Sequence, residues 1–171
     1  METKIFYVLS KYFWLLGIAV TGINALAIEF SCRRHIREHP ELRPAYSRVM
    51  CGMLVWWNLP WVVMGIGIML GRVPTLWHYF FEIRGNVFVL AWWVSVFAMA
   101  IVSLRWAFSR DAAQLCSRLS RLCKWPLLHA TGIGVFMLAA LAGGIVLFTA
   151  IYLRNPPVPE FIEQIEQLAG R

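Results

Sequence analysis

The chain has 171 residues, of which 60% are hydrophobic, 15% aromatic and 15% charged, and its mean hydropathy is +0.63. Soluble domains carry about 25% charged residues and about 45–50% apolar ones, so this composition excludes a soluble, disordered or fibrous protein. The net charge of +7 comes mostly from arginines between apolar stretches. It therefore predicts contact with anionic lipid headgroups and no binding of nucleic acid.

Four apolar stretches are each close to or above the roughly 17–25 residues that a helix needs to cross a bilayer. They predict an all-α integral membrane protein, built as a four-helix transmembrane bundle with short interfacial helices. Residues 1–171 form a single membrane domain in this interpretation. The predicted transmembrane helices cover residues 12–30, 49–70, 86–104 and 127–153.

The basic residues predict the orientation of the bundle. The connecting segments 31–48 and 105–126 carry five basic residues each, ten of the 16 in the chain, whereas segment 71–85 carries two. Because basic loops stay on the cytoplasmic side, the first two segments are predicted to be cytoplasmic and the third to be an outer loop. Both termini then lie outside, and the short loops favour a bacterial inner membrane.

The first connecting segment contains three potential metal ligands. Cys32, His35 and His39 have a spacing found in metal sites, but the arginines between them would repel a cation. We therefore expect no metal site there. Just before them, Glu29 precedes Arg33 by four residues, which predicts an ion pair on one helix face.

The second apolar stretch contains a helix-breaking residue. Pro60 removes one backbone hydrogen bond and frees the carbonyl of Trp56, so the helix should bend there. Beyond the bend, glycines recur with a spacing that allows two helices to approach closely. These glycines predict a surface for helix packing or for a partner, and they are Gly65, Gly67 and Gly71.

The outer loop is short and rich in aromatic residues. Between residues 73 and 84, Thr75, His78 and Glu82 recur at helical spacing and form one narrow polar edge. This composition predicts a turn of helix that rests on the rim of the bilayer.

Several tryptophans lie deep in the second and third stretches, away from the interface where tryptophan is usually found. Trp57 and Trp61 are predicted to face Trp92 and Trp93 across the bundle. Polar side chains from three helices reach similar depths, roughly 9–13 Å at 1.5 Å per residue, and are predicted to hydrogen-bond across helices. The candidate ligand-binding residues are Asn24, Trp57, Asn58, Trp61, Trp92, Trp93 and Ser95.

Three further segments complete the chain. Residues 112–122 are predicted to form a basic amphipathic helix at the membrane surface or an extension of the third stretch. Residues 159–169 predict an acidic amphipathic helix, which is too short to be stable alone in water and must dock on its own bundle or on a partner. The fourth stretch predicts a second packing or partner face at Gly132, Gly143 and Gly144.

The sequence contains no nucleophile–base pair, phosphate loop or pair of carboxylates, so it predicts no enzyme activity. We expect a non-catalytic accessory or structural subunit of a membrane complex, whose partners are the lipid bilayer and other membrane subunits or further copies of the chain. The alternative is a binding or redox protein that holds a quinone-like or haem cofactor in a tryptophan-lined interior pocket. The sequence identifies no particular cofactor.

Overall fold

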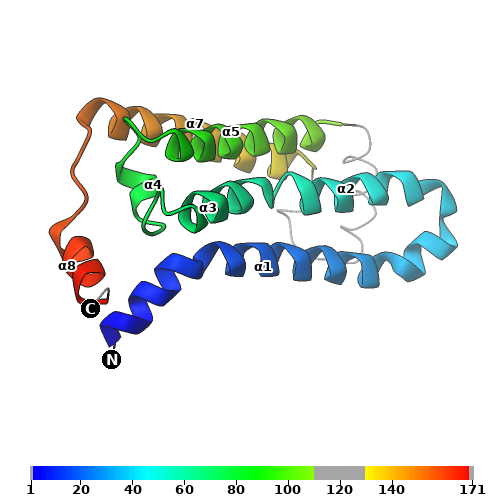
Figure 1. Cartoon of the computed structure of the whole chain (residues 1–171). Helices are drawn as coiled ribbons and strands as arrows, with labels where there is room; N and C mark the ends of the chain where they lie inside the picture. Colours follow the sequence, from blue (N-terminus) through cyan, green and yellow to red (C-terminus); the bar gives the residue numbers. More distant parts are fainter. Residues whose placement is uncertain (1, 110–129, 170–171) are drawn as a thin grey trace.

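The computed structural model describes residues 2–109 and 130–169. Within these ranges the chain forms helices and no strand (Figure 1), which confirms the all-α prediction. The basic helix predicted at 112–122 lies outside the described residues. The elements are α1 (Glu2–Glu38), the 3-10 helix η1 (Pro40–Leu42), α2 (Arg43–Val55), α3 (Leu59–Met69), α4 (His78–Phe81), α5 (Val87–Ala107), α7 (Ala130–Arg154) and α8 (Glu160–Ala169).

Four helical stretches are long and apolar enough to cross a membrane, and each corresponds to one predicted span. They cover Thr3–Arg34, Pro40–Met69, Val87–Ala107 and Gly134–Arg154. Helix α1 extends beyond the predicted residues 12–30 at both ends. With 37 residues and a rise of about 1.5 Å per residue, it is about 55 Å long.

Segment 31–48, the predicted cytoplasmic connection between the first two spans, is mostly helical. Ion pairs between residues four apart support the last turns of α1. Arg33 lies 3.3 Å from Glu29, which confirms the predicted pair, and Arg34 lies 3.1 Å from Glu38. All four side chains are exposed, so the pairs favour the helix only weakly.

A tight connection turns the chain back between α1 and α2. Proline disfavours helical backbone in the preceding residue, and His39, which precedes Pro40, has φ −135°. A small buried cluster then holds α1 against α2, and its members are Cys32, Leu42, Ala45 and Tyr46. The arginine-rich end of the molecule is therefore a packed helical hairpin.

Helices α2 and α3 form one span with a break inside it. Trp56, Trp57 and Asn58 form a turn, and α3 begins at Leu59 with Pro60 in its first turn. The proline has no N–H to bond the carbonyl of Trp56. The break therefore lies where the sequence predicts the bend.

The four membrane-length stretches pack against one another in chain order, and in Figure 1 α1 lies below α2 and α3 while α5 and α7 overlap above them. Helix α1 packs against α2 and α3, α3 packs against α5, and α5 packs against α7. In the apolar windows of the two middle spans 22% of the residues are buried, against 6% in those of α1 and α7. The described helices therefore form a row with two largely uncovered flanks.

The connection between α3 and α5, residues 70–86, folds over the ends of these helices. It contains the predicted turn of helix as α4, but Val73 and Tyr79 have no exposed surface. Tyr79 therefore packs into the protein, whereas Trp77, Phe80 and Phe81 are partly exposed, and contact of this segment with the bilayer rim stays a prediction. The main core of the molecule lies here and comprises Met64, Ile68, Val73, Tyr79, Ile83, Val89, Trp92 and Trp93.

Helix α8 confirms the predicted C-terminal helix and docks on its own chain. It packs against α1 and buries Ile162, whose side chain is 2% exposed. Residues 155–159, which include three prolines, lead from α7 to α8. Since the helix is docked within the chain, it needs no partner to be covered on this face.

Candidate functional site

The four tryptophans proposed to line one pocket differ in their nearest contacts. The indole of Trp61 packs against α1, over Gly17 and edge-on to Phe13, with ring centroids 5.8 Å apart. The Trp57 indole N–H donates to the hydroxyl of Ser103 on α5 at 3.1 Å. Trp61 also packs against the core cluster that contains Trp92 and Trp93, so a shared pocket of the four rings stays a prediction.

Trp92 and Trp93 belong to the main core. Their ring centroids are 5.2 Å apart, and Tyr79 lies 5.5 Å from Trp92. Phe97 and Phe148 lie 5.8 and 5.3 Å from Trp93, whose indole N–H donates to the carbonyl of Tyr79 at 3.0 Å. Aromatic side chains of the protein therefore pack around both indoles. Ligand binding by the tryptophans stays a prediction.

Of the three polar residues predicted to hydrogen-bond across helices, Asn58 does so. The hydroxyl of Thr21 on α1 donates to the side-chain carbonyl of Asn58, whose N–H donates in turn to the carbonyl of Leu54 at 2.9 Å. Asn24 is exposed. Within the described residues its side chain forms no hydrogen bond to another helix, unlike the prediction.

Ser95 also bonds differently from the prediction. Its hydroxyl donates to the carbonyl of Trp92 at 2.7 Å, within the same helix. A serine inside a helix can satisfy itself in this way without a partner helix. The predicted bond across helices is therefore wrong for Ser95 and correct for Asn58 alone.

The glycines of α3 are used for packing within the chain. A Cβ at Gly65 would lie 2.6 Å from the Trp14 ring, and one at Gly67 would collide with the Tyr79 hydroxyl. Gly71 lies beyond the end of α3 and has φ 65°, so it forms a turn that favours glycine. The predicted helix-packing role is therefore wrong for Gly71.

The glycines of α7 have different surroundings. A Cβ at Gly144 would meet Phe97 at 3.5 Å, an ordinary contact, whereas one at Gly143 would have nothing within 4 Å. The surroundings of Gly132 lie outside the described side chains. Gly143 is thus a small residue on an uncovered part of a membrane-length helix.

The weak metal-ligand candidates are not brought together. Cys32 is buried between α1 and α2, and His39 contacts the carboxylate of Glu41 at 3.2 Å. The side chain of His35 lies outside the described ones. In the described part of the chain, no three histidine, cysteine or acidic side chains are placed to hold a metal ion.

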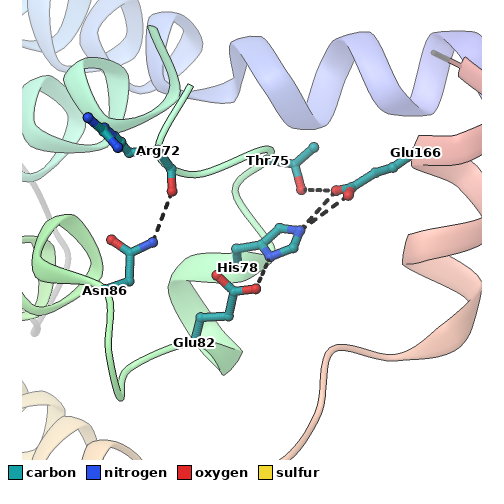
Figure 2. A network of polar contacts seen from close by, with 6 residues as sticks. All are labelled: Arg72, Thr75, His78, Glu82, Asn86 and Glu166. Carbon is teal, nitrogen blue, oxygen red and sulfur yellow. Dashed lines mark hydrogen bonds and ion pairs between the residues drawn. The ribbon is translucent and has the colours of Figure 1, made fainter. Parts of the chain in front are cut away.

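A partly buried polar cluster that the sequence did not predict links α8 to the α3–α5 connection (Figure 2). We call it the outer cluster, and it consists of Thr75, His78, Glu82 and Glu166. His78 Nδ1 lies 2.7 Å from Glu82, and Nε2 lies 3.2 and 3.3 Å from the two Glu166 oxygens. The hydroxyl of Thr75 donates to Glu166 at 2.8 Å.

The outer cluster is buried at Thr75 and His78 and open to solvent at Glu82, whose side chain is 38% exposed. Thr75 is 1% exposed, and the side chain of His78 is 8% exposed. Carboxylates only accept hydrogen bonds, so both contacts are satisfied when both ring nitrogens of His78 carry a proton. The two carboxylates contact opposite ring nitrogens of His78. This arrangement joins α8 to the α3–α5 connection and does not suit the binding of one metal ion by both carboxylates.

Part of the outer cluster was visible in the sequence. The helical spacing of Thr75, His78 and Glu82 identified a polar edge, but Glu166 follows His78 by 88 residues. Only the docking of α8 brings it there. The polar edge therefore faces a helix of the same chain.

Comparison of the chain with known protein families, with curated proteins and with solved structures finds no match. The function is therefore argued from the geometry of the chain itself.

Proposed function

We propose that the chain is an integral protein of a bacterial inner membrane, with its arginine-rich end in the cytoplasm. Four helices have the length and composition for this. The exposed side chains of Arg33, Arg34, Arg37 and Arg43 lie at the α1–α2 hairpin. Both ends of the chain lie at the opposite end of the molecule (Figure 1). The positive-inside bias supports this orientation.

We infer that the protein is a non-catalytic accessory or structural subunit of a membrane complex. The observation that carries this proposal is a face of α7 that the described residues leave open. Helix α7 packs on α5, and among the described residues nothing lies within 4 Å of a Cβ at Gly143. Ala139, one turn earlier, is exposed. Small residues four apart allow another transmembrane helix to approach closely.

The packing of the polar and aromatic groups favours this role over the alternative. The outer cluster connects segments of the chain, and Thr75 and His78 in it are buried. The rings of Trp92 and Trp93 lie against other aromatic side chains, which leaves the quinone-like or haem cofactor with less support. The exposed surface of α7 is therefore the proposed binding surface for a partner helix.

The test compares two glycine variants in a mild detergent by native mass spectrometry. Gly143→Leu adds a side chain on the proposed face, whereas Gly22→Leu adds one on α1 at an equally open position. We expect the parent and the α1 variant to retain a subunit or second copy at fixed stoichiometry, and the α7 variant to lose it.

Equal retention by both variants, or a bare monomer throughout, would overturn the proposed role. A bound small molecule of constant mass would support the cofactor alternative instead. Extraction of the parent from membranes by alkaline carbonate would contradict integral insertion, whatever the partner result.

A further inference from the structure

A hollow of about 610 Å³ lies where α3 ends and α5 begins. Its lining combines apolar and polar side chains from the two ends of the α3–α5 connection. The lining residues are Leu70, Arg72, Gly85, Asn86, Val87 and Phe88. A concave surface of this size is in the range of small-molecule sites, which run from about 300 to about 1,000 Å³.

Hydrogen bonds fix the backbone around this hollow. The N–H of Arg72 donates to the carbonyl of Gly67 at 3.0 Å, and the Arg72 carbonyl accepts from the Asn86 side chain at 3.0 Å. The Asn86 side-chain oxygen accepts in turn from the N–H of Phe88 at 3.0 Å, at the start of α5. Asn86 therefore joins the two walls, so the site is formed before a ligand binds.

The charge of Arg72 is available to a ligand. Its side chain is exposed, and among the ion pairs of the described residues none involves it. Figure 2 shows its guanidinium pointing away from Glu82 and Glu166. The nearby Arg84, by contrast, lies over the ring of Tyr152 at 4.7 Å. The hollow thus presents one unneutralised positive charge.

The apolar part of the lining lies beside this charge. Leu70 is 61% exposed and Val87 is 70% exposed, at the ends of two membrane-length helices. A ligand that satisfies both parts has an anionic head and an apolar tail. A guanidinium binds phosphate through two parallel hydrogen bonds, and a phospholipid supplies phosphate and acyl chain in one molecule.

We propose that this hollow binds an anionic phospholipid of the outer leaflet, with its phosphate at Arg72 and its acyl chain along Leu70 and Val87. A zwitterionic lipid binds less well, because its ammonium group brings a second positive charge close to the guanidinium. The inference rests on the proposed membrane location. It does not depend on the partner face of α7.

The test measures lipid retained per chain by native mass spectrometry after release from nanodiscs containing equal amounts of phosphatidylglycerol and phosphatidylcholine. We expect the parent to retain phosphatidylglycerol preferentially. Arg72→Gln should lose about tenfold of this retention, since it removes one charge-assisted contact. Arg154→Gln is the matched control, because it removes an exposed arginine from the same end of the molecule, and it should retain the lipid.

A further variant and an anion titration test the same assignment. Arg72→Lys keeps the positive charge but lacks the planar guanidinium. It should retain an amount of phosphatidylglycerol between those of the parent and Arg72→Gln. Delipidated protein is titrated with inorganic phosphate and with glycerol phosphate. Binding of these anions as tight as that of the lipid would overturn the lipid assignment in favour of a free-phosphate site.

Equal loss in Arg72→Gln and Arg154→Gln, or equal retention of both lipids by the parent, would also overturn it. If Arg72→Gln alone fails to fold, the comparison of Arg72→Lys with the parent decides. Failure of the chain to incorporate into nanodiscs at all would instead contradict the proposed membrane location, so the two failures are distinguishable.

Discussion

Replacing Glu166 by alanine should release α8 from the rest of the molecule. The substitution removes the acceptor of the Thr75 hydroxyl at 2.8 Å and the carboxylate that contacts His78 Nε2 at 3.2 Å. It leaves a hydroxyl and a ring nitrogen in a site where the His78 side chain is 8% exposed. The remaining contact of His78 is with Glu82, on its own segment.

The expected magnitude follows from these contacts. Hydrogen bonds to charged groups contribute about 1.5–3 kcal/mol each, and the Glu166 side chain is 18% exposed, which weakens its share somewhat. We expect docking of α8 to lose about 2–4 kcal/mol in total. A ten-residue helix is marginal alone in water, so an undocked α8 also unfolds.

Hydrogen exchange of the α8 backbone amides in detergent measures this loss. At about 1.4 kcal/mol for each tenfold change, exchange between Phe161 and Leu168 should accelerate by about 30-fold to about 700-fold. Glu163→Ala is the control, because it removes an exposed carboxylate from the same helix. Equal exchange rates in both variants would refute the argument that the outer cluster holds α8.

Three further predictions concern contacts between helices. Gly67→Leu should destabilise the fold by about 1–3 kcal/mol through its collision with the Tyr79 hydroxyl, whereas Gly143→Leu should leave the thermal midpoint in detergent unchanged. Thr21→Val should lower the free energy of unfolding by about 1 kcal/mol, because it removes the hydrogen bond to Asn58. Coinciding circular-dichroism melts of the variant and the parent would contradict this. Burial raises the pKa of Tyr79 above its ordinary value, so the folded state favours the protonated phenol. This group's contribution to the free energy of unfolding is complete below about pH 10 and is lost as the pH rises further. Tyr79→Phe should therefore show a smaller loss of stability at alkaline pH than the parent, and identical pH profiles would contradict this.

The parts of the fold that the sequence predicts are those determined by local chemistry. Apolar stretches of sufficient length identify the four spans, since helix length and bilayer thickness are related directly. Pro60 identifies the break between α2 and α3, because its effect acts on the residues next to it. The pair of Glu29 and Arg33 follows from a spacing of four residues.

The sequence leaves open those features for which one composition suits two environments. An aromatic segment with a polar edge suits a bilayer rim as well as a packed core, and only contacts distant in sequence decide between them. Arginine and glutamate also favour helix, and segment 31–48, identified only as a basic connection, is mostly helical. Thr21 bonds Asn58 across 37 residues, a distance over which spacing carries no information.

The outer cluster also sets an order of events during synthesis of the chain. His78 leaves the ribosome 88 residues before Glu166, and at about 5–20 residues per second this interval lasts roughly 4–18 s. By its end α3 and α5, which supply core partners of this segment, have both been synthesised. Helix α8 is therefore the last part of the outer cluster to be made, and Thr75 and His78 lack their contacts with Glu166 until then.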